Sequence, residues 1–124
     1  VNSRVGTDVT LEATFVAPDT IIAFVPWEGR VVCAEAGGWL RCRDPASGSV
    51  VIQHHVTDVE FSCLLLSGCI WTGSTNGSIH CFALGDLSPI ATCSLHEDGV
   101  TALVKCTQGV LASASDGRVS LWDR

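Results

Sequence analysis

A histidine, two serines and an aspartate lie close together in the last third of the sequence. They are His96, Ser113, Ser115 and Asp116, and hydrolases use a serine activated by a histidine and oriented by a carboxylate for nucleophilic catalysis. Two features argue against this chemistry. Asp116 stands in a predicted tight turn, and there is no Gly-x-Ser-x-Gly segment that would expose a nucleophilic serine. We therefore predict no catalytic residue and a protein that is not an enzyme.

Histidines and cysteines could also bind zinc. His54 and His55 are adjacent, but neighbouring side chains on a strand point to opposite faces, so these two cannot easily share an ion. The seven cysteines include no Cys-x-x-Cys pair. Cys42 and Cys81 fill the position that Leu121 occupies in the repeat described below. We thus expect small buried thiols in an intracellular, cytoplasmic protein, with no metal and no cofactor.

The composition indicates a folded domain with enough apolar residues to form a packed core. Of the 124 residues, 47% are hydrophobic and 16% are charged. The net charge is −6 and the seven lysines and arginines are scattered, whereas proteins that neutralise phosphates carry a basic patch. No apolar run approaches the roughly 18 residues that cross a bilayer. We expect neither nucleic acid nor a membrane as a partner.

Three segments of the chain align without a gap, with a period of about 40 residues that indicates a repeat architecture. They are VVCAEAGGWLRCR (31–43), IWTGSTNGSIHCF (70–82) and VLASASDGRVSLW (110–122). Each has a turn-forming dipeptide at its centre: Gly37-Gly38, Asn76-Gly77 or Asp116-Gly117. This pattern predicts β-hairpins with type I′ turns. Apolar and polar residues alternate after each turn, so one face of every hairpin is expected to be buried.

Further strands are predicted on both sides of these hairpins. Residues 21–25, 56–61 and 100–104 precede them, and residues 49–54 and 90–95 follow the first two. Helical periodicity is absent. The predicted fold class is therefore all-β, and each unit is a four-stranded antiparallel meander.

The strands predicted at the two ends of the sequence together make up one further unit. The third unit lacks a fourth strand, and residues 9–15 (VTLEATF) are predicted to form a lone outer strand before the first complete unit. We divide the chain into this strand, a first blade at 20–54, a second at 56–95 and a third at 96–124. In this interpretation the third blade is shared between the termini.

From His96 to Asp123 the sequence resembles a WD repeat. The similarity consists of a histidine five residues before Thr101, small residues in the second strand, Asp116 in the turn, and the closing pair Trp122-Asp123. It weakens upstream, where Phe82-Ala83 and Arg43-Asp44 replace Trp-Asp. The period and the turns extend the resemblance over about residues 9–124.

This resemblance implies blades of a β-propeller, with protein binding as the usual role. It also implies a structural hydrogen-bond network in a well-formed blade. Its members here would be His96, Asp116, Trp122 and either Ser113 or Ser115. Each such bond contributes only about 0.5 to 1.5 kcal/mol net, but an unpaired buried partner is costly.

Two tryptophans are candidates for a partner surface. Trp27 stands in the turn Pro26-Trp27-Glu28-Gly29 and has no counterpart in the other units, and exposed tryptophans are enriched at protein interfaces. Packing against its own or a neighbouring blade is the alternative. Trp39 follows the Gly-Gly turn and is a second candidate.

Three blades cannot close a ring, which needs roughly four to eight. We expect the remainder to come from further sequence of the same protein or from a second copy of the chain, with the former favoured because the sequence has no initial Met and stops within a blade. The predicted function is a non-enzymatic scaffold for protein partners. The alternative is a small lectin-like propeller of identical chains that binds sugar, although Trp27 and Trp39 do not recur in each blade as a lectin would require.

Overall fold

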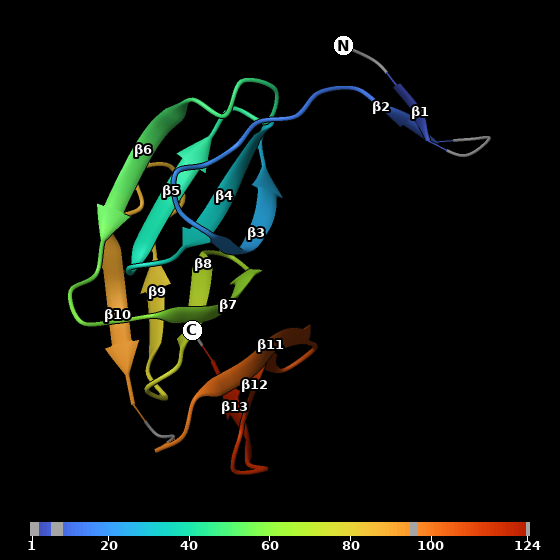
Figure 1. The fold of residues 1–124 in the computed structure, drawn as a ribbon. Helices are drawn as coiled ribbons and strands as arrows, with labels where there is room; N and C mark the ends of the chain where they lie inside the picture. The colour runs from blue at the N-terminus through green and yellow to red at the C-terminus, as the bar shows by residue number, and fades with distance from the viewer. Residues whose placement is uncertain (1–2, 6–8, 95–96, 124) are drawn as a thin grey trace.

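The protein is described by a computed structural model that covers residues 3–5, 9–94 and 97–123. All regular structure in these residues is β, as the sequence predicted. The strands form one sheet after another along the chain (Figure 1). The described residues form no helix, so none of them makes a helix capable of crossing a membrane.

Three of the sheets are antiparallel meanders, which we call blades 1, 2 and 3. Blade 1 contains β3 (Ile21–Trp27), β4 (Arg30–Glu35), β5 (Trp39–Arg43) and β6 (Val50–His55). Blade 2 contains β7 (Phe61–Leu66), β8 (Ile70–Ser74), β9 (Ile79–Phe82) and β10 (Pro89–Cys93). Blade 3 contains β11 (Val100–Cys106), β12 (Gly109–Ala114) and β13 (Val119–Trp122) and has three strands in the described part of the chain.

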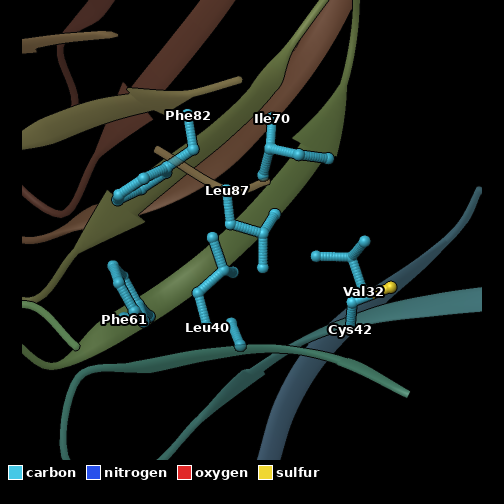
Figure 2. Close-up of a cluster of buried hydrophobic side chains, with 8 residues drawn as sticks. Val32, Leu40, Cys42, Phe61, Ile70, Phe82 and Leu87 are labelled. Carbon is cyan, nitrogen blue, oxygen red and sulfur yellow. The ribbon is translucent and has the colours of Figure 1, made fainter. Parts of the chain in front are cut away.

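Consecutive blades bury apolar faces against one another. The first core cluster lies between blades 1 and 2 (Figure 2) and comprises Val32, Ala34, Leu40, Cys42, Phe61, Ile70, Phe82 and Leu87. The second lies between blades 2 and 3 and comprises Cys69, Trp71, Ile79, Cys81, Val100, Leu103, Val110 and Ala112. Burial of this apolar area drives folding, so each blade depends on its neighbour, as expected for a repeat protein.

The three blades repeat one another in backbone detail. The pairing of the first two strands shifts register at the same place, between Ile21 and Ala23, and at the equivalent steps in blades 2 and 3. The residue after each second strand donates its backbone N–H to the carbonyl of the residue just before the first strand: Ala36 to Thr20, Thr75 to Glu60, Ser115 to Gly99. The predicted internal repeat is therefore present in the structure.

The hairpin turns differ from the predicted type I′ in blades 2 and 3. Gly37 and Gly38 both have positive φ, but in the other two turns only Gly77 and Gly117 do. In blade 2 the Ser74 N–H donates to the Ser78 carbonyl at 3.0 Å and the Gly77 N–H donates to the Ser74 carbonyl at 3.1 Å. In blade 3 the equivalent bonds, from Ala114 to Arg118 and from Gly117 to Ala114, are both 3.0 Å. This is a type I turn followed by a left-handed glycine, the other common hairpin connection. Asparagine at position 76 has negative φ there, so the dipeptide pattern alone did not distinguish the two turns.

The first strand of blade 2 lies five residues later than predicted. The sequence pattern placed it at 56–61, whereas β7 begins at Phe61. Asp58 has φ 60°, which ends any extended run there. The run FSCLLL lacks alternation because β7 is sandwiched between blades 1 and 3 and buries both faces.

The predicted lone strand at 9–15 is shorter in the structure. It forms β2 (Val9–Leu11), which pairs with β1 (Ser3–Val5) in a separate hairpin that stands apart from the blades in Figure 1. Pairing β2 with β1 closes only a short loop and therefore costs little conformational entropy. Pairing of this strand with β13 would need a closed ring or a second chain, and it remains a prediction.

Candidate functional site

Two of the predicted network residues have partners other than those expected. The Trp122 indole donates from Nε1 to Ser120 Oγ at 2.7 Å. The Ser113 hydroxyl instead lies 2.7 Å from Thr101 Oγ1 on β11. The network implied by the resemblance does not include Ser120. Ser120 stands two residues before Trp122 on the same strand, and the two side chains therefore lie on the same face.

Two further network residues, Ser115 and Asp116, lie at the turn of blade 3. Asp116 Oδ1 accepts from the backbone N–H of Arg118 at 2.9 Å, and Oδ2 lies 3.5 Å from Arg118 Nε. Ser115 is exposed, and its backbone N–H donates to the Gly99 carbonyl at 3.0 Å. His96 lies outside the described residues, so the complete network remains a prediction.

The middle of each third strand carries a polar side chain that bonds within its own blade. The residues are Arg41, His80 and Ser120, which occupy one position of the repeat. Arg41 Nε donates to Gln53 Oε1 at 3.0 Å, and His80 Nδ1 lies 3.1 Å from Thr92 Oγ1. Both partners are the directly paired residues on the fourth strand. Alternation in the sequence located these polar positions but not their partners.

His80 is the best-connected of these side chains. Its Nε2 lies 3.1 Å from Ser78 Oγ, which in turn donates to Asn76 Oδ1 at 2.6 Å. The ring also stacks on Phe82, with 6.2 Å between centroids. Burial lowers the pKa of His80 below its ordinary value of 6.5. A neutral imidazole held on both nitrogens is suited to bracing blade 2.

Blade 1 contains a buried ion cluster that was not predicted from the sequence. The Glu35 side chain is fully buried and accepts two hydrogen bonds from Arg43, at 2.7 and 2.9 Å, and one from Arg41 at 2.8 Å. Arg43 also donates to the Gly48 carbonyl at 2.7 Å. Burial raises the pKa of the Glu35 carboxyl, but the hydrogen bonds and charges of both arginines outweigh it and hold the pKa below 4.5.

Alignment of the three units shows that Glu35 and Arg43 both differ in residue type from their equivalents in the other blades. Arg43 occupies the position of Phe82 and Trp122, and Glu35 occupies the position of Ser74 and Ala114. Where the closing aromatic residue becomes an arginine, the small residue opposite becomes a glutamate. A lone buried charge would be costly, so each exchange requires the other.

Residues 12–20, which we call the strap, pass over this part of blade 1. The side chain of Phe15 lies against Gly48, where an added Cβ would meet Phe15 side-chain carbons at 2.5 to 2.8 Å. The Arg43 guanidinium carbon is 6.0 Å from the same ring centroid. Asp19 lies 3.6 Å from Arg41. The strap therefore screens the ion cluster from solvent.

An apolar groove of about 410 Å³ adjoins the strap. It is lined by Phe15, Ile21, Phe24, Val31, Cys33 and Pro45. Phe24 is 65% exposed, which is unusual for a phenylalanine in a strand. Burial, and secondarily the Glu35 charge, raises the pKa of the Cys33 thiol to about 11. The thiol is therefore protonated at neutral pH and unsuited to act as a nucleophile.

The two candidate tryptophans have different surroundings. Trp27 ends β3 and is half-buried against the core between blades 1 and 2. Trp39 is half-buried at the turn of blade 1, with its ring 4.5 Å from the His55 ring and 4.3 Å from the Arg41 guanidinium carbon. His55 Nε2 lies 2.8 Å from the Gly37 carbonyl, which fixes the imidazole beside the indole.

Neither histidine of the 54–55 pair faces the other. His55 contacts Trp39, whereas His54 lies 5.5 Å from the Phe82 ring in the direction of blade 2. Within residues 3–5, 9–94 and 97–123, histidine, cysteine and acidic residues form no group of three or more that could hold a metal ion.

These sheets are blades of a β-propeller. The sequence matches no protein-family model and no curated protein, but solved structures share the fold. The computationally designed Ika8 protein superimposes with a TM-score of 0.72 at 23% identity, over 83% of this chain and 33% of that one. The WD40 β-propeller domain of Doa1 gives 0.66 at 16% identity, over 73% and 32%.

A third structure is closer in size. The computationally designed Ika4 protein has a TM-score of 0.50 at 17% identity, over 86% of this chain and 92% of that one. The chain thus spans about a third of Ika8 and of the Doa1 domain. The predicted all-β blade architecture is confirmed.

Proposed function

We propose that this chain is part of a WD-type propeller that acts as a non-enzymatic scaffold for protein partners in the cytoplasm. The WD assignment is supported by the residues of blade 3, which end in Trp122-Asp123, and by the likeness of the fold to a WD40 domain. The remainder of the ring would come from further blades of the same protein or from a second copy.

The surface that carries this proposal is the Trp39 edge, defined as Trp39, His55 and Glu60 around the turn of blade 1. Trp39 is braced by Arg41 and His55, and Glu60 accepts from the Gly37 backbone N–H at 3.1 Å. A tryptophan that is already held in place loses little entropy on binding, and such anchors dominate protein interfaces. Trp27, being packed on the core, would contribute only its free edge.

The chemistry of the chain favours proteins over other partners. The net charge of −6 and the scattered basic residues disfavour nucleic acid and anionic membranes. The lectin-like alternative has less support, because the two candidate tryptophans occur only in blade 1 and do not recur in the other blades.

Site-specific crosslinking in cells tests this proposal. A photoreactive residue replaces Trp39 in one variant and Ile90, an exposed residue of blade 2, in the control. We expect a discrete protein adduct from position 39 and none from position 90. Equal adducts at both positions, or none at position 39, would reject the Trp39 edge. Binding to a glycan array that Trp39→Ala abolishes would favour the lectin.

A further inference from the structure

Four polar side chains form one chain of hydrogen bonds across blade 2. Thr92 Oγ1 on β10 lies 3.1 Å from His80 Nδ1 on β9, and His80 Nε2 lies 3.1 Å from Ser78 Oγ. Asn76 Oδ1 accepts from the Ser78 hydroxyl at 2.6 Å and from the Ser78 backbone N–H at 3.0 Å. The chain of bonds thus runs from the outer strand of the blade to its hairpin turn.

The direction of each bond follows from Asn76. Its Oδ1 atom can only accept, so the one hydrogen of the Ser78 hydroxyl is used there. Ser78 Oγ must then accept from His80, which places the imidazole proton on Nε2. Nδ1 of the neutral imidazole is an acceptor, so the Thr92 hydroxyl donates to it. Burial lowers the pKa of His80 below 6.5, which keeps the ring neutral at neutral pH.

This arrangement has the parts of an activated nucleophile. A hydroxyl becomes nucleophilic when a neighbouring base accepts its proton and a third group holds that base in orientation. Thr92 supplies the hydroxyl, His80 Nδ1 is the base, and Ser78 fixes the ring through Nε2. Ser78 is only 7% exposed and donates to Asn76, so it is not the nucleophile.

The threonine is accessible while its base is held inside the blade. Thr92 is exposed although blade 2 packs against a blade on each side. The His80 ring is half-buried and stacks on the buried Phe82 ring, with 6.2 Å between centroids. A small molecule in solution can therefore reach Thr92 without displacing the imidazole.

Pairing of the two outer strands does not require these residue types. In blade 1 the same two positions carry Arg41 and Gln53, whose side chains are joined by a hydrogen bond of 3.0 Å. An arginine is not a base at neutral pH and an amide is not a nucleophile. Blade 1 thus joins its outer strands without a reactive pair, and the hydroxyl and imidazole of blade 2 supply chemistry that strand pairing does not need.

We propose that Thr92 is an acyl-acceptor site, modified by activated acyl esters with His80 as the general base. The Thr92 oxygen bonds the acyl carbon while the hydroxyl proton passes to His80 Nδ1. The bond from the acyl carbon to the leaving group breaks, and His80 gives the proton to the departing oxygen and becomes neutral again. The product is an O-acylated threonine on the outer strand of blade 2. This inference is independent of the Trp39 edge and of the proposed scaffold function.

Acetylation by p-nitrophenyl acetate tests the proposal within the wild-type chain. Thr101 is the matched control, because it is also an exposed strand threonine but its hydroxyl lies 2.7 Å from another hydroxyl, Ser113 Oγ. Peptide mapping by mass spectrometry follows the acetyl group at each residue. A positioned general base accelerates such reactions by roughly 10²- to 10⁴-fold, so Thr92 should react at least about tenfold faster than Thr101. No acetyl group on Thr92, or equal rates at the two threonines, would overturn the proposal.

A variant and a pH profile assign the base. His80→Gln can still hydrogen-bond Thr92 but cannot take its proton, so the rate at Thr92 should fall to that at Thr101. In the wild type the rate at Thr92 should rise with pH as His80 loses its proton, and level off above pH 6.5. His54 approaches the Phe82 ring from β6, at 5.5 Å between centroids, so His54→Gln is the control and should leave the profile unchanged.

Circular dichroism checks that both variants are folded. The pH profile of the wild-type chain needs no variant and stands if His80→Gln fails to fold. An undiminished rate at Thr92 in folded His80→Gln, or a wild-type rate that does not change between about pH 5 and 8, would show that His80 is not the base and would overturn the proposal.

Discussion

The guanidinium of Arg43 holds the fully buried carboxylate of Glu35 by two hydrogen bonds, from Nε to Oε2 at 2.7 Å and from Nη2 to Oε1 at 2.9 Å. In the other blades an aromatic residue and a small residue occupy these two positions. In blade 1 a buried ion pair therefore fills the space that an aromatic and a small side chain fill in the other blades. The strap crosses this ion pair and shields it from water.

Removing one partner of this pair should be more damaging than removing both. We expect Arg43→Phe to lower the free energy of unfolding by about 3 to 5 kcal/mol, because the buried Glu35 carboxylate loses two of its three hydrogen bonds and keeps only Arg41 as a partner. The double variant Glu35→Ser with Arg43→Phe, which copies blade 2, should recover most of this loss. Urea denaturation measures both. A double variant as unstable as the single one would show that the two positions are not coupled.

Stability should also depend on the titration of His80. Burial lowers its pKa in the folded state below 6.5, so the neutral form stabilises the fold. This contribution is complete above pH 6.5 and is lost as the pH falls through the lowered folded pKa. His80→Gln should flatten the unfolding free energy between about pH 7 and 5. Identical pH profiles for the two proteins would contradict this expectation.

The contact between Phe15 and Gly48 can be tested with a matched pair of glycines. Both Gly48 and Gly29 have positive φ, at 78° and 75°, but an added Cβ meets the Phe15 ring only at Gly48. Gly48→Ala should therefore be more destabilising than Gly29→Ala, by about 1 to 3 kcal/mol for an overpacked contact. It should also speed hydrogen exchange at the Ala36 amide, which bonds Thr20 of the strap. Equal effects of both substitutions would place the strap elsewhere.

The bond from Trp122 to Ser120 predicts a non-additive pair of substitutions. Trp122→Phe keeps the apolar ring but loses the indole donor, and Ser120→Ala loses the acceptor; each should cost about 1 kcal/mol. The double variant should cost no more than the larger of the two. Trp122→Ala and His96→Ala should both lower the melting temperature sharply. An unchanged melting curve for His96→Ala would remove that histidine from the network.

The repeat could be predicted from sequence because it depends on local chemistry. Turn-forming pairs such as Asn76-Gly77 and the alternation that follows them define hairpins wherever they occur. The prediction of β7 was wrong in its position because a strand buried on both faces has no alternation. The partner of Trp122 was missed for a related reason, since the resemblance supplied residue types but not distances.

By itself, the sequence determined that the chain is all-β and that its units repeat about every 40 residues. These properties follow from side-chain periodicity and backbone conformation, which act over a few residues. The predicted apolar face of the hairpin is buried in blades 1 and 2, but in blade 3 its residues Val119 and Leu121 are exposed. Only the tertiary structure decided that Glu35 meets Arg43, that Phe15 covers them, and that Phe24 and Leu121 stay exposed. Those outcomes depend on which faces pack together, and packing joins residues far apart in the chain.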